Sequence, residues 1–372
     1  MWKAKEAVYK TGDNRRKNNN PLRSMEIMSK TEAGASNGSA AKSFPVLGLD
    51  VGTSRIVLSW KDSEHYSFNS QLNAFVAVPY TRMTENALRR EGVPFEKHEH
   101  ELVVLGNEAP RFADLLNVEM RRPMVQGVLN PAESESIPVI RNIIETMMRQ
   151  TDSGKPKVYF SVPAAPLHAD EGLTYHEATL RQMFADMKYP VQVINEGLAV
   201  VYSELEDTNF TGIGISCGGG LCNVCLAYLS MPAFSFSVPK AGDFIDASVA
   251  GVTGDLSNRV RIVKEDNFHF NGAYPEKLHQ VIAVYYDDMI QSLINGMKEA
   301  FSNTKKMPKL SKPIPIVLSG GTASPKGFRD RFEKLLRATD FPVQISEIRL
   351  ARNPMTATAK GALVAGLAES EA

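Results

Sequence analysis

Residues 45–62 read PVLGLDVGTSRIVLSWKD, and this stretch decides the fold. Apolar residues cluster on both sides of Gly52, which predicts a strand, a tight glycine turn and a second strand. The second half of the chain opens in the same way, because residues 211–229 (TGIGISCGGGLCNVCLAYL) are again apolar on both sides of a glycine turn. Two halves that each open with such a hairpin predict a duplicated α/β architecture.

Strands and helices are expected to alternate after each hairpin. Strands are expected at residues 102–106, 157–163 and 191–195, and helices at 132–149, 174–187 and 197–205. One helix of the second half is expected to bury Tyr285, Met289, Leu293 and Met297 on one face. Residues 313–336 indicate a strand, a Gly-Gly turn and a helix, and residues 353–367 a closing helix of small residues.

The composition is that of a globular protein with a basic, polar start. The chain has 372 residues, 43% of them hydrophobic and 23% charged, which is enough for two domains with cores of their own. Residues 1–45 hold nine Lys and Arg against four Asp and Glu, so the rest of this neutral chain carries a surplus of five acids. The low apolar content of residues 1–45 predicts a disordered basic tail. The acidic remainder argues against nucleic acid as a partner.

The sequence indicates a cytoplasmic location. No apolar run approaches the roughly 20 residues that span a bilayer, and the first residues lack the apolar core of a secretory signal. Three cysteines, Cys217, Cys222 and Cys225, form no disulfide framework, as expected in a reducing cytoplasm. The segment 2–9 pairs aromatic residues with lysines, which leaves open a membrane-surface anchor or a tether to a membrane protein.

Three glycine turns are candidate phosphate sites: residues 50–54 (DVGTS), 218–220 (GGG) and 319–322 (SGGT). Without a Cβ, their backbone N–H groups can approach a phosphate and point at it together. Thr53 and Ser54 add hydroxyl donors, and Asp50 can hold Mg²⁺ through water. No Walker loop occurs, and an ordinary hairpin also uses glycine, so the three turns are informative only together.

In order and spacing, five segments resemble the actin superfamily, which also holds the seventy-kilodalton heat-shock chaperones and the sugar kinases. LGLDVGTSRIVL and GISCGGGLCNVCLA resemble its two phosphate loops, VQVINEGLAVVYS and ATAKGALVAG its two connecting segments, and PIVLSGGTASPKGF its adenosine motif. MRRPMVQGVLNP (120–131), VVLGNEA (103–109), KAGDFIDASV (240–249) and RVRIVKEDNFHF (259–270) are most similar to the bacterial actins of the MreB and MamK type.

This resemblance implies an actin-like ATPase fold: two duplicated ribonuclease-H-like lobes around a nucleotide cleft. Lobe I would comprise residues 46–195 and 350–372, and lobe II residues 196–349. The implied function is that of an ATP-binding cytoskeletal protein that polymerises with itself into filaments, for cell shape or organelle positioning. The implied cofactors are ATP and Mg²⁺.

The resemblance also assigns roles to residues. Asp50 would orient the Mg²⁺ water, and Glu196 would polarise the attacking water. The phosphates would be held by Gly52, Thr53 and Ser54 from one side and by Gly218, Gly219 and Gly220 from the other. Lys264 and Glu265 would meet the ribose, and Gly320 and Gly321 the adenosine.

The second phosphate loop departs from the family pattern D-x-G-x-G-T. Ser216 stands at the acidic position, Leu221 at the threonine, and Asn223 at a later acid. Phosphoryl transfer depends on positioning and charge, so each lost contact is expected to raise the barrier by about 2–4 kcal/mol. The glycine donors remain, so we expect an ATP binder with slow turnover.

Several alternatives stay open. A non-polymerising ATP-dependent chaperone or assembly factor and a nucleotide-dead scaffold share this fold, whereas a small-molecule kinase would need an aspartate where Ser216 stands. The cysteines have part of an iron–sulfur spacing, and a zinc site with His269 is conceivable, but burial in a sheet is the favoured interpretation. Arg55 is interpreted as solvated at a strand edge, with a phosphate contact as the alternative.

Overall fold

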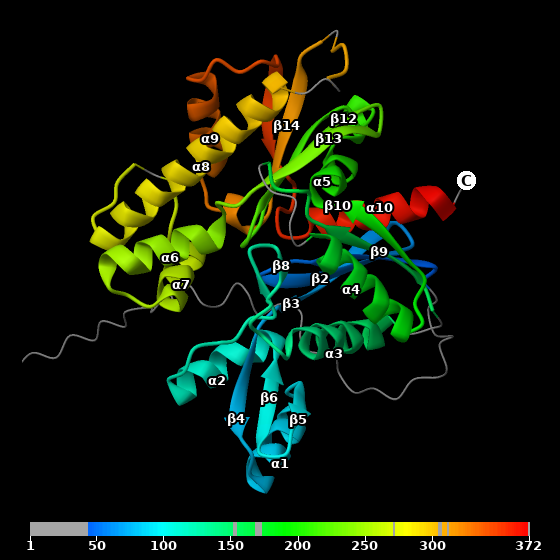
Figure 1. Ribbon diagram of the computed structural model, residues 1–372, viewed down its shortest axis with the longest axis vertical. Helices are drawn as coiled ribbons and strands as arrows, with labels where there is room; N and C mark the ends of the chain where they lie inside the picture. Colours follow the sequence, from blue (N-terminus) through cyan, green and yellow to red (C-terminus); the bar gives the residue numbers. More distant parts are fainter. Residues whose placement is uncertain are drawn as a thin grey trace, which may run out of the picture. The chain divides into compact units, whose positions relative to one another are not determined.

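The hairpin predicted at residues 45–62 forms the centre of a five-stranded sheet (Figure 1). The computed structural model describes residues 44–151, 155–167, 173–270, 272–303, 307–310 and 312–370. The sheet order is β10-β9-β1-β2-β3, in which β1–β3 are antiparallel neighbours and β1, β9 and β10 are parallel. Its strands are β1 (Val46–Val51), β2 (Arg55–Asp62), β3 (His65–Leu72), β9 (Lys157–Val162) and β10 (Val191–Asn195).

A second sheet repeats this topology. Its order is β13-β12-β11-β14-β15, again with an antiparallel hairpin and meander on one side and two parallel strands on the other. The strands are β11 (Gly212–Cys217), β12 (Cys222–Tyr228), β13 (Met231–Val238), β14 (Ile314–Ser319) and β15 (Ile345–Leu350). The duplication that the two glycine hairpins predict is therefore confirmed.

Helices cover both faces of each sheet, which is why the central strands are apolar throughout. The outer face of the first sheet packs on α3 (Ser136–Met148) and α4 (Leu173–Asp186). The outer face of the second sheet packs on α8 (Lys277–Asn303) and α9 (Phe328–Arg337). A separate core lies between the sheets, around α5 (Glu196–Glu204) and α10 (Ala357–Ser370).

The helices α5 and α10 cross at the contact of Gly361 with Ala199. A Cβ on Gly361 would lie 1.7 Å from the carbonyl oxygen of Ala199. Only glycine permits this close approach, so close helix packing explains the small residues of the helix predicted at residues 353–367.

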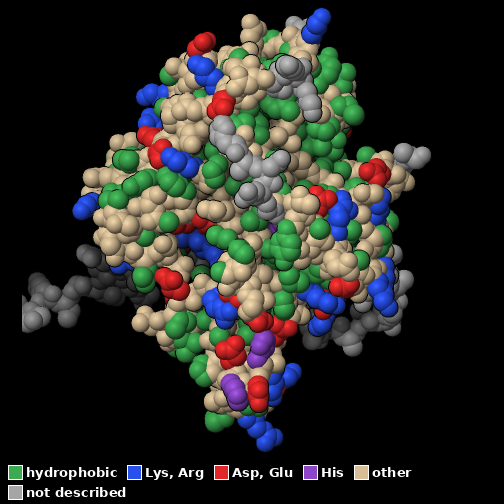
Figure 2. Space-filling model, in the orientation of Figure 1, with side chains coloured by type: hydrophobic (Ala, Val, Ile, Leu, Met, Phe, Trp, Pro, Cys, Tyr) green, Lys and Arg blue, Asp and Glu red, His purple; other side chains and the backbone are tan. Residues whose placement is uncertain are grey.

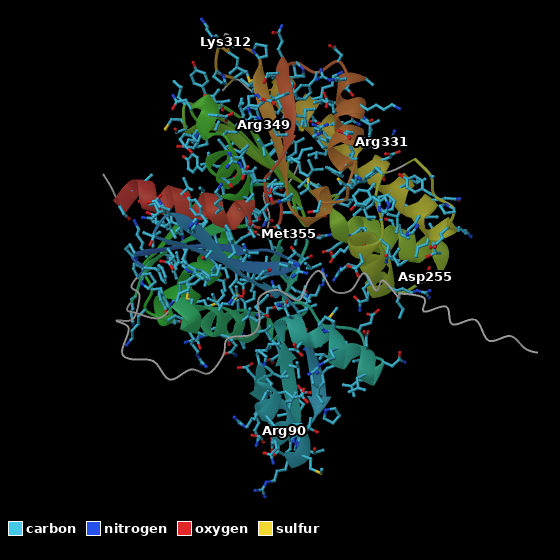
Figure 3. All side chains as sticks on the ribbon, turned by 180° about the vertical axis from the view of Figure 1, so that it is seen from behind. Arg90, Asp255, Lys312, Arg331, Arg349 and Met355 are labelled. Carbon is cyan, nitrogen blue, oxygen red and sulfur yellow. The ribbon has the colours of Figure 1, made fainter. Side chains whose placement is uncertain are left out.

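Each sheet carries an insertion. After β3 the chain forms a small sheet, β4-β6-β5, with two helices, a core of its own and a short β7–β8 hairpin. After β13 it forms α6 and α7, which pack beside α8. Arg90 lies at the far tip of the first insertion and Asp255 at the tip of the second (Figure 3). The remaining elements are β4 (Phe75–Pro79), α1 (Arg82–Glu91), β5 (Phe95–Lys97), β6 (Glu101–Leu105), η2 (Gly106–Glu108), α2 (Ala109–Leu116), β7 (Met124–Val125), β8 (Val128–Leu129), η3 (Arg149–Thr151), η4 (Glu206–Thr208), α6 (Gly242–Thr253), α7 (Ser257–Asp266) and η5 (Gly321–Ala323).

Three predictions need correction or qualification. The tyrosine fully buried on α8 is Tyr286, whereas Tyr285 is only partly buried. Residues 1–43 of the predicted tail lie outside the described residues. Phe44 and Pro45 belong to the folded part, because Phe44 packs on Trp60 and the Pro45 carbonyl accepts a 3.0 Å hydrogen bond from Lys157 N. The lobe boundaries stay a prediction.

In the described part of the chain, no helix is both long and apolar enough to cross a bilayer.

Candidate functional site

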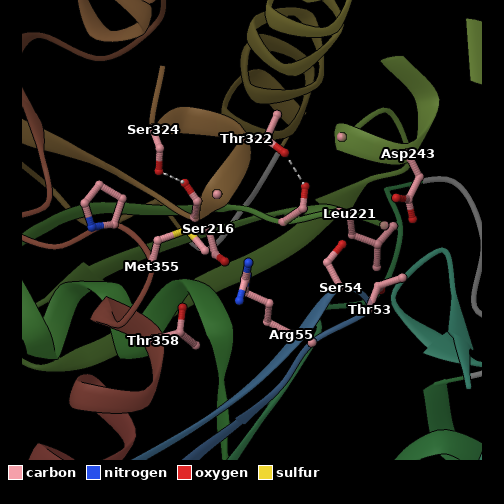
Figure 4. Close-up of a pocket in the computed structure, with 18 of the residues that line it drawn as sticks. Thr53, Ser54, Arg55, Ser216, Leu221, Asp243, Thr322, Ser324, Met355 and Thr358 are labelled. Carbon is pink, nitrogen blue, oxygen red and sulfur yellow. Dashed lines mark hydrogen bonds between the residues drawn. The ribbon is translucent and has the colours of Figure 1, made fainter. Parts of the chain in front are cut away.

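One cleft is lined by all the residues to which the resemblance assigned a role. Figure 4 shows Thr53 and Ser54 of the first loop in this cleft, with Ser216 and Leu221 of the second. The cleft lies between the glycine turns of the two sheets and extends to α7 and the β14–α9 turn. The predicted residues that line it are Asp50, Gly52, Thr53, Ser54, Glu196, Gly218, Gly219, Gly220, Lys264, Glu265, Gly320 and Gly321. Their grouping is a fact of the fold, and their chemical roles remain predictions.

The glycines of the second loop are needed because the first loop lies against them. A Cβ on Gly219 would lie 2.2 Å from Ser54 Oγ, and a Cβ on Gly220 would lie 2.2 Å from Gly127 N. Gly127 N donates a 3.0 Å hydrogen bond to Thr53 Oγ1. The hydroxyl of Thr53 therefore holds the β7–β8 turn, and its own proton remains available to a phosphate.

Two carboxylates, Asp50 and Glu196, face the base of the cleft. Asp50 Oδ1 accepts a 2.6 Å hydrogen bond from Ser161 Oγ. Burial raises the pKa of Asp50 above its ordinary value, although the bond from Ser161 opposes that rise. Burial also raises the pKa of Glu196, and the nearby charge of Asp50 raises it further. Because these two acids do not readily ionise at the same time, a bound cation would stabilise their ionised forms.

The residues that replace the family's acids contact Glu196 directly. Ser216 Oγ donates to Glu196 Oε2 at 3.1 Å, and Asn223 Nδ2 donates to the same oxygen at 2.9 Å. Asn223 Oδ1 in turn accepts a 2.8 Å hydrogen bond from Ala164 N, at the end of β9. Ser216 and Asn223 thus orient Glu196 but bring no negative charge of their own.

At the predicted ribose end, Lys264 already has partners. Its buried Nζ lies 2.7 Å from Asp246 Oδ1 and donates a 3.0 Å hydrogen bond to the carbonyl of Gly242. Glu265, by contrast, is exposed at the cleft edge. Asp246 also lines the cleft, and burial raises its pKa to about 6 despite the opposing effect of Lys264. Sequence reasoning missed Asp246, although GDFID at residues 242–246 places it one helical turn after Asp243.

At the predicted adenosine end, the Gly-Gly turn is shaped by close contacts. Gly320 has a φ of +91°, and a Cβ there would lie 2.1 Å from the Cys217 carbonyl oxygen. Thr322 Oγ1 donates a 2.7 Å hydrogen bond to the Gly218 carbonyl, which ties this turn to the second phosphate loop. Met355 lies beside Gly321 near the centre of the molecule (Figure 3).

An ion pair that sequence reasoning missed joins the two sides of the cleft. Arg122, just before β7, places Nη1 2.9 Å from Asp243 Oδ1, at the start of α6. The backbone N of Asp243 donates a 2.8 Å hydrogen bond to the Gly219 carbonyl. Acidic and basic side chains meet in a hollow beside α6 and α7 (Figure 2). The motif around Arg122 signalled its importance, but only the fold shows its partner.

Two side interpretations are now decided. Cys217, Cys222 and Cys225 are free and fully buried in the hydrophobic cores, as favoured from the sequence. Among the described residues no cluster of His, Cys, Asp and Glu could hold a metal ion by itself. Arg55, the first residue of β2, is half-buried and lines the cleft, so the phosphate contact stays open as the alternative to a solvated side chain.

The chain is similar to proteins of one kind. The profile of the Volactin family matches residues 46–366. The actin-like protein MamK of Magnetospirillum gryphiswaldense is 23% identical over 244 residues, which are 63% of this chain and 62% of that relative. The matched region therefore spans less than two thirds of the relative's length.

Two solved structures share the fold. The MamK double helical filament superposes with a TM-score of 0.62 at 19% identity, covering 87% of this chain and 98% of that chain. MreB 5 of Spiroplasma citri bound to AMPPNP superposes with a TM-score of 0.63 at 13% identity, covering 89% and 98%. The predicted actin-like fold, with two repeated lobes around a cleft, is therefore confirmed.

Proposed function

This chain belongs to the Volactin family and has the actin fold, and from that premise we propose that it is a cytoskeletal protein that binds ATP in its cleft and assembles into filaments. One observation carries the proposal. The glycine turns of two repeated sheets face each other across one cleft, with Asp50 and Glu196 at its base.

The phosphates would be bound mainly by backbone. Backbone N–H groups of the two loops would approach the phosphates from opposite sides. In the second loop these are the N–H groups of Gly219 and Gly220, because those of Gly52 and Gly218 already donate to the carbonyls of Arg55 and Leu221. The hydroxyls of Thr53 and Ser54 add donors. A nucleotide held in this way contacts both lobes and stabilises the closed arrangement, which is a shift in population.

Mg²⁺ fits the donors at the base of the cleft. Mg²⁺ is commonly bound by one or two carboxylates together with substrate phosphates and water, and Asp50 is a suitable carboxylate. Burial raises the pKa of Asp50, and burial together with the nearby charge of Asp50 raises the pKa of Glu196; a bound cation would favour the ionised form of both acids. When bound, Mg²⁺ would neutralise phosphate charge.

Turnover is proposed to be slow. Glu196 would polarise the attacking water, and Ser216 and Asn223 hold its carboxylate in place. A water-polarising acid must be ionised, yet the pKa of Glu196 is raised by burial and by Asp50. Ser216 and Leu221 supply neither the carboxylate nor the hydroxyl found at these positions in relatives.

Assembly would use a head-to-tail interface, since a heterologous contact whose rotation does not close produces an open filament. The solved MamK structure that shares this fold is a double helical filament, which supports self-association here. We propose a cytoplasmic location and a role in cell shape or organelle positioning. A tether between the filament and the membrane is part of this proposal.

The test is sedimentation of the full chain with and without Mg²⁺-ATP, with electron microscopy of the pellet and phosphate release from the same tubes. Filaments that require Mg²⁺-ATP and release little phosphate support the proposal. Asp50→Asn should abolish them, whereas Asp255→Asn, which changes a carboxylate outside the cleft, should not.

A second candidate is a nucleotide-independent scaffold, favoured by the loss of an acid at Ser216 and of a hydroxyl at Leu221. Equal pellets with and without nucleotide, with no nucleotide affinity in titration calorimetry, would establish it and contradict ATP binding. A protein that stays in the supernatant under every condition would contradict both filament proposals.

A further inference from the structure

Arg55 is fixed at the mouth of the first phosphate loop. It is the first residue of β2, and its carbonyl accepts the 2.9 Å hydrogen bond from Gly52 N that closes the turn. Val57, two residues later on the same face of β2, also lines the cleft, and its partner across the hairpin is Asp50. The half-buried side chain of Arg55 points into the cleft beside the loop (Figure 4).

The other cations that line the cleft have acidic partners. Lys264 pairs with Asp246, and Arg261 contacts both Asp246 and Asp243. The guanidinium of Arg55, by contrast, has no hydrogen bond or ion pair with any residue in the described part of the chain. A guanidinium held in a cleft without a partner is suited to a planar, bidentate contact with an anion.

The acid of the first loop has a partner of its own, because Asp50 Oδ1 accepts a 2.6 Å hydrogen bond from Ser161 Oγ. The cleft lacks a hydroxyl at Leu221 and an acid at Ser216, which weakens the second loop as a site for phosphate and Mg²⁺. The guanidinium of Arg55 is the positive charge that the first loop offers to a phosphate chain.

We propose that Arg55 is a phosphate-binding residue, whose guanidinium holds the phosphate chain of the nucleotide from the side of the first loop. This inference rests on the proposed function, because it names a further residue of the same site. It has two consequences. Part of the affinity should persist without Mg²⁺, and the contribution of Arg55 should depend on phosphate and not on the adenosine.

The test is titration calorimetry of the full-length protein with adenosine, AMP, ADP and ATP, each in Mg²⁺ and in EDTA. Arg55→Gln should weaken ADP and ATP binding at least tenfold and leave adenosine binding unchanged, with the larger loss in EDTA. Arg55→Lys keeps the positive charge but lacks the paired N–H donors of the guanidinium, so it should bind ADP and ATP more tightly than Arg55→Gln and less tightly than the wild type. Arg259→Gln changes an arginine that is 73% exposed and outside the cleft, and it should match the wild type.

The outcomes separate the two proposals. A wild-type protein that binds no nucleotide overturns the proposed function, and this inference with it. A wild type that binds ADP, with Arg55→Gln within twofold of it, overturns only the role of Arg55. An equal loss for adenosine and ADP would show that Arg55 shapes the loop and would also overturn the inference.

Discussion

Glu196 is the residue in which structural stability and the proposed chemistry conflict. Its carboxyl is surrounded by donors from Ser216 and Asn223, yet burial and the charge of Asp50 raise its pKa above the ordinary 4.5. A carboxyl with a raised folded-state pKa releases its proton more readily in the unfolded chain. Stability therefore falls as the pH rises from about 4.5 to the folded-state pKa, at about 1.4 kcal/mol for each pKa unit.

Glu196→Gln removes this cost and can accept the same two hydrogen bonds. We expect the variant to unfold at a higher temperature than the wild type at pH 8–9, with a difference that shrinks to nothing near pH 4.5. Thermal unfolding from pH 4.5 to 9 checks this. Glu99→Gln, at a side chain that is 88% exposed, should show no such trend. A constant difference across the range would contradict the raised pKa.

The second phosphate loop offers a gain-of-function prediction. Ser216→Asp combined with Leu221→Thr restores the carboxylate and the hydroxyl of the family pattern at two residues that already line the cleft. We expect steady-state phosphate release to rise on the order of a thousandfold or more, since two groups worth about 2–4 kcal/mol each are restored. Ser216→Asn with Leu221→Thr is the uncharged control. Unchanged turnover in the first variant would place the slow step outside this loop.

At the scale of residues, the sequence was informative wherever a backbone had to approach another group. Gly219, Gly220 and Gly320 were predictable because the absence of a side chain is itself a signal. A Cβ at each of these positions would lie less than 3 Å from an atom of a neighbouring residue. Arg122 with Asp243 was not predictable as a pair, because the partners are far apart in the chain. The direction of the Arg55 side chain was not predictable, because a position at a strand end does not show which way the side chain points.

Among the elements, the crossing of α5 and α10 is the most tightly constrained. A valine at Gly361 would meet the backbone of Ala199, which cannot move without shifting α5 and the sheet beneath it. We expect Gly361→Val to destabilise the protein by about 3 kcal/mol or more, at the upper end for overpacking. Urea unfolding measures it.

Gly251 in α6 provides the matched control, because nothing lies within 4 Å of a Cβ placed there. Gly251→Ala should stabilise the protein by about 1 kcal/mol through helix propensity. A Gly361→Val variant as stable as the wild type would show that α5 and α10 can separate without cost.

The strands that the sequence revealed are mostly buried, although β10 has only one fully buried residue. The central hairpins and β9, β10 and β14 have apolar runs between clear turns, so these strands could be predicted from the sequence. β3 (His65–Leu72, HYSFNSQL) was missed, since it is an edge strand with polar residues and no buried one. In the first insertion, β6 was predicted at residues 102–106, whereas β4 and β5 were missed, because they depend on pairing with β6 and periodicity does not reveal that pairing.

At the scale of the whole folded unit, the two sides of the cleft are joined unequally. Between the sheets, the core around α5 and α10 is continuous and apolar. At the opposite rim, a polar contact joins the two sides: the ion pair between Arg122 and Asp243. Polar contacts exchange with water at little net cost, whereas separating a packed core is expensive. Opening should therefore be a rotation about the α5–α10 side, with the two insertions moving most.

This hinge predicts a distance change that fluorescence can measure. Dyes on Arg90→Cys, at the tip of the first insertion, and on Leu256→Cys, between α6 and α7, report the separation of the insertions. The three native cysteines are fully buried, so labelling should be selective. We expect transfer efficiency to rise on addition of Mg²⁺-ATP, in a large excess of unlabelled protein that dilutes transfer between neighbouring subunits.

Dyes on Leu256→Cys and Val284→Cys, both within the second lobe, should show no change. Constant efficiency in a protein that binds ATP by calorimetry would mean that the nucleotide acts without closing the cleft, and the link between closure and assembly would be wrong.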